Sequence, residues 1–403
     1  MPINSRQIHA IGRGAILVLF LVLSGHVLVA QSYTWAWAQG INGNNEDVVT
    51  GVANDNASGA IYAAGYTKSS GAITGTAGTV SGGQDAFLIK YTTSGSLAWS
   101  FTPSGNGTSQ ATGIAVDANG NSYVTGWYKN SIDLHGLSAT GSGVLIGNGD
   151  LNWFIASYAS DGTLRWCSQV GGPNDDTPSS IAVSNDAVYV LGTIKGRITT
   201  PYGSVSNSLP TGKYNLVLVK YSLNGSGQWL VSGGSNDDES AHSVATDEDQ
   251  VYVAFRTKNT DHKWYGPSGN TLVSSSALDN WDLRVSAFTA TGSHSWIVAV
   301  NESEDSYAGP ASLATGCGAV YLTSSTHAPT SFPGVGNVNT GTHDLFFLGR
   351  LSRANGQFEW VTTGTTTADT HTIGGRDIAI GQNGIIHVSG TYKNDLTIGN
   401  QTV

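Results

Sequence analysis

The chain has 403 residues, a formal net charge of −10 at pH 7 and only 11% charged residues. This sparse, acidic charge pattern excludes the basic surface that nucleic acids select, and 39% hydrophobic residues in regular periods exclude a disordered chain. Two cysteines, Cys167 and Cys317, allow one disulfide but exclude a disulfide-rich scaffold, so stability must come from packing.

Residues 1–30 have the pattern of a secretory signal peptide. Arg6 and Arg13 precede an apolar run over residues 15–23, and Ala30 is a small residue at a plausible cleavage position. The run is too short to cross a bilayer, which takes about 20 apolar residues. We therefore expect cleavage near Ala30 and a secreted or cell-surface mature chain, residues 31–403, that does not insert into a membrane.

A repeat of about 65 residues follows this leader. A tryptophan marks each copy, and from the second tryptophan onward a glycine stands four positions before it. The series begins at Trp37 and continues as Gly95–Trp99, Gly162–Trp166, Gly225–Trp229, Gly292–Trp296 and Gly356–Trp360.

Each repeat also contains two predicted β-hairpins. The first is typified by "IAVDANGNSYVTG" (114–126), where Asn119-Gly120 predicts a tight turn with both residues at positive φ. The second is typified by "DAFLIKY" (85–91), followed by a turn at Gly95. An alanine recurs in the first strand, and we expect a larger side chain there to collide with the neighbouring unit. These alanines are Ala53, Ala115, Ala182, Ala245, Ala314 and Ala379.

Four short antiparallel strands per repeat predict an all-β fold, a β-propeller, with no helix longer than about two turns. A β-solenoid is the alternative architecture, but its repeats are usually shorter. The predicted blades cover approximately residues 38–99, 100–166, 167–229, 230–296, 297–360 and 361–403. The sixth is predicted to be incomplete, because no "DAFLIKY" strand follows its first hairpin; either the last blade lacks this strand or a longer chain continues it.

The runs "GGQDAFLIKYTTSGSLAW" (82–99) and "GIAVDANGNSYVTGWY" (113–128) resemble the bacterial SBBP-type β-propeller repeat family. The resemblance covers most of residues 33–403 and weakens in the fourth and fifth copies, as in "DLRVSAF" (282–288). It implies a secreted or surface propeller of bacterial origin and no shared catalytic residues. The glycine–tryptophan phrase also resembles quinoprotein dehydrogenase repeats, but the period is long for them and the cysteines are not adjacent.

Acidic pairs recur before the first strand of several repeats, at Asp175–Asp176 and Asp237–Asp238 among others. Clustered carboxylates could bind Ca²⁺. They could equally accept backbone N–H groups in the connection between blades, and recurrence once per blade favours this structural role. We therefore expect no metal and no cofactor.

Two tryptophans outside the period, Trp127 and Trp264, follow the second strand of their repeats and are speculative ligand-binding residues; covering the rim of the blade is the alternative. No nucleophile elbow, P-loop or zinc motif is present, so no catalytic residue is predicted. The sequence favours a non-enzymatic scaffold that binds an unidentified protein or glycan. A spacer within a larger surface protein, and a hydrolase or lyase that uses the propeller channel, remain alternatives.

Overall fold

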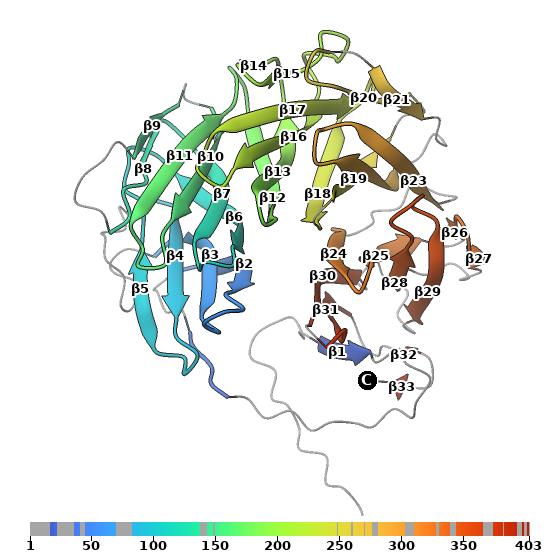
Figure 1. The fold of residues 1–403 in the computed structure, drawn as a ribbon, viewed down its shortest axis with the longest axis horizontal. Coiled ribbons are helices and arrows are strands. Elements are labelled where there is room, and N and C mark those ends of the chain that lie inside the picture. The colour runs from blue at the N-terminus through green and yellow to red at the C-terminus, as the bar shows by residue number, and fades with distance from the viewer. Residues whose placement is uncertain are drawn as a thin grey trace, which may run out of the picture. The chain divides into compact units, whose positions relative to one another are not determined.

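The computed structural model describes residues 17–21, 36–40, 45–69, 83–137, 143–147, 150–247, 249–258, 261–269, 271–275, 281–302, 310–327, 330–338, 344–365, 374–381, 383–392, 397–398 and 401–402 (Figure 1). The chain divides into two compact units, residues 29–299 and residues 1–28 with 300–403. Throughout these described ranges the structure consists of strands, turns and irregular segments. No helix able to cross a bilayer occurs among them.

The unit of residues 29–299 is built from four successive antiparallel sheets, each made of two hairpins, as the repeat predicts (Figure 1). In order, their strands are β2 (Asp47–Asn54), β3 (Ile61–Thr67), β4 (Asp85–Tyr91) and β5 (Leu97–Phe101); β6 (Ser109–Val116), β7 (Ser122–Tyr128), β10 (Asn152–Tyr158) and β11 (Leu164–Val170); β12 (Asp176–Val183), β13 (Ala187–Ile194), β16 (Asn215–Ser222) and β17 (Gly227–Gly234); and β18 (Glu239–Thr246), β19 (Gln250–Thr257), β22 (Asp282–Thr289) and β23 (His294–Glu302).

The connections between the second and third strands carry small extra hairpins. They are β8 (Ser131–Asp133) with β9 (Val144–Ile146), β14 (Thr199–Thr200) with β15 (Gly203–Ser204), and β20 (His262–Tyr265) with β21 (Thr271–Ser275). The last of these belongs to the fourth repeat, yet β20 pairs with β17 of the third. It therefore extends the sheet of the preceding blade to six strands.

The second unit contains a fifth sheet, β24 (Ser312–Gly316), β25 (Ala319–His327), β28 (Asp344–Leu351) and β29 (Phe358–Thr365), extended by β32 (Thr397–Ile398) and β33 (Gln401–Thr402). The hairpin β26 (Thr330–Phe332) and β27 (Gly336–Val338) pairs with the end of β23. The first hairpin of the sixth repeat is β30 (Gly374–Ile380) and β31 (Ile386–Thr391), and β1 (Leu17–Leu21) pairs with β31. The protein thus has five four-stranded blades of a β-propeller. The predicted sixth, incomplete blade is not confirmed; among the described residues, β30 and β31 lie in a three-stranded sheet with β1.

The first strands of neighbouring blades contact one another in the order β2, β6, β12 and β18. A side chain at Gly51 would meet Ile114 Cγ2 at 3.2 Å, and one at Gly113 would meet Ile181 Cγ2 at 3.2 Å. The recurring alanines Ala53 and Ala115 are partly buried and pack against core clusters that two neighbouring blades share. A further tight position lies two residues before each alanine, at a glycine.

The recurring glycine and tryptophan also meet between blades. Gly225 lies in the β16–β17 turn at φ 88°, and a Cβ there would lie 2.6 Å from Trp166 Cδ2 of the preceding blade. The Trp166 indole N–H donates to the carbonyl of Leu223 in the same turn, at 3.0 Å. The glycine thus provides room for the preceding repeat's indole, 59 residues away, rather than for the tryptophan four residues on.

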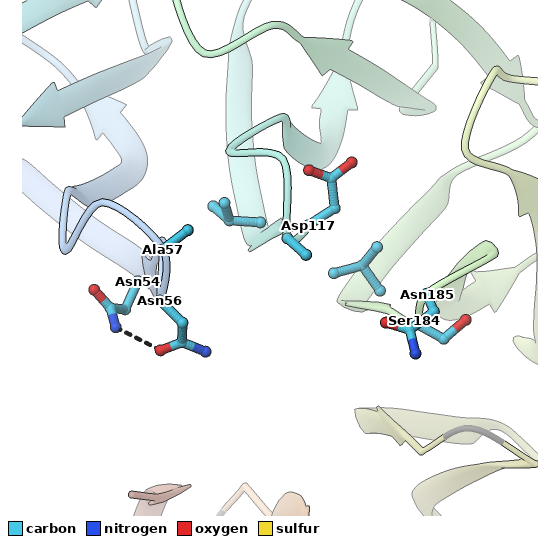
Figure 2. A pocket seen from close by; sticks show the side chains of 9 residues that line it. Asn54, Asn56, Ala57, Asp117, Ser184 and Asn185 are labelled. Carbon is cyan, nitrogen blue, oxygen red and sulfur yellow. Dashed lines mark hydrogen bonds between the residues drawn. The ribbon is translucent and has the colours of Figure 1, made fainter. Parts of the chain in front are cut away.

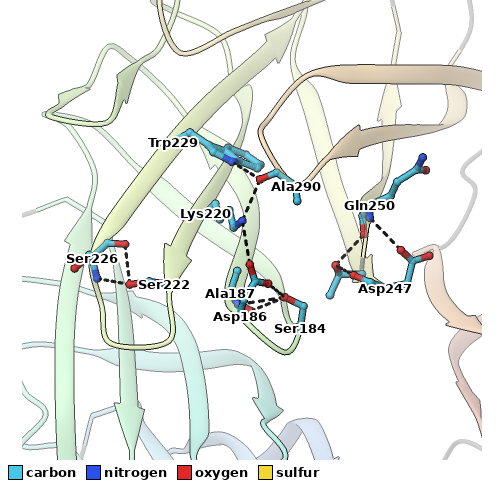
Figure 3. Close-up of polar contacts among 11 residues, drawn as sticks. Ser184, Asp186, Ala187, Lys220, Ser222, Ser226, Trp229, Asp247, Gln250 and Ala290 are labelled. Carbon is cyan, nitrogen blue, oxygen red and sulfur yellow. Dashed lines mark hydrogen bonds and ion pairs between the residues drawn. The ribbon is translucent and has the colours of Figure 1, made fainter.

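The same arrangement recurs along this unit, and Figure 3 shows it for Trp229 and Ala290. In each case the indole Nε1–H donates a hydrogen bond of 3.0 Å to a backbone carbonyl in the turn of the next blade. The pairs are Trp37 with Thr93, Trp99 with Ser160, and Trp229 with Ala290. Trp37 lies outside any described strand, yet it makes the contact that a fourth-strand tryptophan makes in the other blades.

A cation covers the tyrosine ring of the first hairpin in the first three blades. Lys90 Nζ lies 5.0 Å from the Tyr62 ring, and Lys220 Nζ lies 5.5 Å from the Tyr189 ring. The second blade has a serine at the corresponding position of β10, and there Arg165 from β11 lies 5.8 Å from the Tyr123 ring. A cation therefore lies over the tyrosine ring in all three blades, although it comes from the third strand in two of them and from the fourth strand in the other.

Replacing Gly225 with alanine is expected to lower the free energy of unfolding by about 2–5 kcal/mol. The left-handed backbone accounts for about 1–2 kcal/mol and the collision with Trp166 for about 1–3 kcal/mol. Gly269 is the matched control, because it has φ 78° and no neighbouring atom lies within 4 Å of the position that an added methyl group would take. Gly269→Ala should cost only about 1–2 kcal/mol in a urea titration. Equal losses of unfolding free energy in the two variants would contradict a specific contact between Gly225 and the Trp166 indole.

Candidate functional site: a polar hollow at three hairpin turns

A hollow of about 450 Å³ lies where the first-hairpin turns of the first three blades come together (Figure 2). It belongs entirely to the unit of residues 29–299. Its lining residues are Asn54, Asn56, Ala57, Val116, Asp117, Ala118, Val183, Ser184 and Asn185.

The repeat itself brings these residues together. Asn54, Val116 and Val183 each directly follow the recurring alanine of their own first strand, so they occupy equivalent positions in three neighbouring blades. Val116 and Val183 are half-buried, whereas Asn54 is exposed. The hollow therefore has small apolar side chains toward two blades and an amide toward the third.

The carboxylate of Asp117 stabilises its own turn. Its Oδ1 accepts the N–H groups of Asn119 and Asn121 at 2.9 Å, and its Oδ2 accepts the Tyr123 hydroxyl at 2.9 Å. Only Gly120 of the predicted Asn-Gly pair has positive φ. The predicted two-residue turn is therefore wrong; the turn is longer and depends on Asp117, as Asx-type turns do.

Asp55 has the same role in the first blade, where it accepts the N–H groups of Ala57 and Ser58. Burial acts to raise the pKa of Asp55, but the hydrogen bonds from Ser58 and Ala57 outweigh it and lower the pKa. Both carboxylates are thus engaged by their own turns.

Amides and a hydroxyl supply the remaining polarity of the hollow (Figure 2). Asn54 Nδ2 donates to Asn56 Oδ1 at 2.8 Å, and Ser184 Oγ donates to Asp186 Oδ1 at 2.8 Å. Asn185 is exposed at the third turn. Such a lining offers both donors and acceptors without a basic group, which suits a neutral polar ligand better than an anion.

The central part of this site matches a known repeat. Residues 104–127, which include β6, most of β7 and the turn at Asp117, match the family described as "SBBP: Beta-propeller repeat". The chain contains an SBBP β-propeller repeat. An uncharacterized WD repeat-containing protein of Acanthamoeba polyphaga mimivirus is 25% identical over 202 residues, which cover 43% of this chain and 14% of the viral protein.

The two tryptophans singled out from the sequence lie elsewhere in the blades. Trp264 on β20 is fully buried; its indole donates to Ser286 Oγ at 3.1 Å, and its ring packs edge-on against Phe255 and Phe288. Protein side chains thus surround the ring that was predicted to bind a ligand, and the ring belongs to a hydrophobic core cluster. Trp127 on β7 is half-buried and faces Trp153 across the ladder. Neither lines the hollow.

The acidic pairs hold the connections between successive repeats. Asp175 Oδ1 accepts the N–H of Leu151 at 3.2 Å, and Asp238 Oδ1 accepts the N–H of Tyr214 at 2.9 Å, 24 residues apart in both cases. Asp237 pairs with Lys213 at 2.9 Å. These contacts are of the kind expected if the acidic pairs accept backbone N–H groups in the connections between blades.

Asp176 is buried at the start of β12. It accepts the N–H groups of Gly172 and Lys195. Burial nevertheless raises its pKa to about 6. Within the described ranges, no three His, Cys, Asp or Glu side chains are placed to share a metal ion, and neither cysteine forms a disulfide.

The fourth blade has a buried charged cluster where its sequence departs from the repeat. Arg284 takes the β22 position that Phe87 and Phe154 take in β4 and β10, and it is 1% exposed. Its guanidinium lies 3.9 Å from Asp282, while His262 Nδ1 lies 3.5 Å from Glu239 Oε2. The hairpin β20–β21 supplies His262, so the connection between the second and third strands of the fourth repeat supplies part of this cluster.

The recurring carboxylates predict a small response to chelation. Because Asp175, Asp176 and Asp238 already accept backbone N–H groups, EDTA should change the melting temperature by less than about 5 °C, or roughly 1 kcal/mol for a domain of this size. Differential scanning calorimetry with and without added Ca²⁺ measures this. A larger fall that Ca²⁺ reverses would contradict the structural interpretation.

Two histidines of the fourth blade predict loss of stability in acid. Burial, with a contribution from Arg256, lowers the pKa of His242 to about 3, and burial, with a contribution from His262, lowers that of His294 to about 4. The unfolded chain protonates near 6.5, so stability is complete above that pH and declines toward pH 4 by at most about 1.4 kcal/mol per pH unit per histidine.

Asp176 acts in the opposite direction, because its raised pKa adds stability as the pH falls from about 6 to its ordinary value. The histidine effect is therefore measured as a difference between variants. Urea titrations at pH 7 and pH 4.5 should show a smaller acid loss for His242→Gln and His294→Gln than for the parent chain. An unchanged pH slope in both variants would contradict the assignment.

Proposed function

We propose that this protein is a secreted or cell-surface, non-enzymatic propeller of bacterial origin that binds a neutral glycan in the hollow of the first three blades. The observation that carries the proposal is the lining: amides at Asn56 and Asn185, a hydroxyl at Ser184, and small apolar side chains between them. Such a surface pairs hydrogen bonds with sugar hydroxyls and apolar contact with a sugar ring's C–H groups.

Two further features support this proposal. The leader-like residues 1–30 favour export, and the acidic mature chain disfavours anionic ligands. A glycosidase needs two carboxyl groups flanking the bond it cuts, and Asp117 is the single acidic residue in the lining of this hollow. A spacer role within a larger surface protein remains the second candidate, favoured by the tandem blades themselves.

A glycan array probed with the purified chain tests the proposal. We expect selective binding of uncharged oligosaccharides, with Asn185→Ala and Asn56→Ala each weakening affinity roughly 3- to 10-fold for one lost hydrogen bond. Ala118→Trp should abolish binding by filling the hollow while leaving the melting temperature unchanged.

The matched control is Asn119→Ala, an exposed asparagine in the same turn that does not line the hollow. It should bind like the parent chain. Binding that survives Ala118→Trp would place the glycan elsewhere, and an empty array together with capture of a peptide by the hollow would replace the glycan with a protein ligand.

A further inference from the structure

The sixth repeat has an unusual third strand. β31 pairs on one side with β30 from its own hairpin and on the other with β1, residues Leu17–Leu21, antiparallel over five residue pairs (Figure 1). Both partners lie in the same compact unit as β31. The apolar segment of the predicted leader therefore forms part of a sheet in the uncut chain.

The register of this pairing is that of a regular blade. In the first three blades a glycine of the second strand lies opposite the third residue of the third strand: Gly65 opposite Phe87, Gly126 opposite Phe154, and Gly192 opposite Val217. In the sixth sheet the corresponding glycine, Gly390, lies opposite Leu17. β1 thus occupies the third-strand position without a slip.

The sequence of β1 suits that position. Third strands are covered on both faces by neighbouring blades, so β4, β10 and β16 each contain a run of buried residues. β1 reads Leu-Val-Leu-Phe-Leu, an unbroken apolar run of the same kind. Its partner strand β31 buries the alternate apolar residues Ile386 and Val388, each 4% exposed.

We propose that the edge of β31 is a strand-acceptor site, which binds an extended apolar peptide in the third-strand register. Residues 17–21 are its occupant in the uncut chain. Cleavage of the leader removes this strand, and the edge then takes up a third-strand-type segment from another polypeptide by strand addition. Backbone hydrogen bonds supply affinity there, and the apolar run supplies selectivity. This site is independent of the glycan hollow.

Disulfide trapping in the full chain tests the register. In a background with Cys167→Ser and Cys317→Ser, cysteines are introduced in pairs at Leu19 with Val388 and at Phe20 with His387, which lie opposite each other. Opposed pairs alternate between two hydrogen-bonding types, so at least one of these pairs should cross-link readily on mild oxidation.

The control joins Leu19 to His387, one residue out of register, which places the two side chains on opposite faces of the sheet. It should not cross-link. Peptide mapping by mass spectrometry reads out the bonds. Equal yields for the three pairs, or none at all, would overturn the assignment of β1 to this edge.

Peptide binding tests the acceptor function. A fluorescent peptide with the sequence of residues 85–91, "DAFLIKY", should bind the full chain carrying Leu19→Pro and should bind the parent at least tenfold more weakly, because β1 already occupies the edge. A proline in the matched control, Val27→Pro, lies outside β1 and should leave binding at the parent level.

Hydrogen exchange on the same variants shows whether folding is preserved. Amides of β31 should exchange faster in Leu19→Pro than in the parent, while amides of β16 stay protected. Adding the peptide should restore protection of β31. Peptide binding without that protection, or equal binding to parent and variant, would contradict the acceptor site.

Discussion

The blades of residues 29–299 depend on one recurring contact, an indole seated on a glycine of the next blade. The indole needs the space that a Cβ would fill at Gly225, and the turn needs the positive φ that glycine adopts without strain. The Nε1–H of Trp166 then pairs with a turn carbonyl, so the bulky ring is buried with its polar atom satisfied. The glycine therefore determines both the conformation of the turn and how closely the neighbouring blade can pack against it.

That spacing has a consequence at the first hairpins. Once consecutive blades are held at a regular offset, equivalent turns come side by side, and their exposed residues form a shared surface. Asp117 stiffens one of these turns through four hydrogen bonds, and Asp55 stiffens its neighbour. The hollow they border is thus presented by rigid turns, which lowers the entropy cost of ordering a binding site.

The fourth blade shows how the repeat accommodates a departure. A phenylalanine position holds Arg284, which requires an acid nearby, and Asp282 meets that requirement on the same strand. The hairpin β20–β21 then contributes Trp264 and His262 against the same sheet. The variable connections therefore help to hold neighbouring blades together, although from sequence they are the least regular part of the repeat.

Features that arise from local chemistry could be predicted from the sequence: the 65-residue period, the two hairpins per repeat, and the turns at Gly95 and Gly225. Alternating apolar residues and positive-φ glycines act within a few residues, so a pattern reveals them. Tertiary structure alone decided that Gly225 serves Trp166, that Trp264 is core, that three turns share a hollow, and that residues 17–21 pair with β31. Each depends on packing between segments far apart in the chain, for which no local spacing carries a signal.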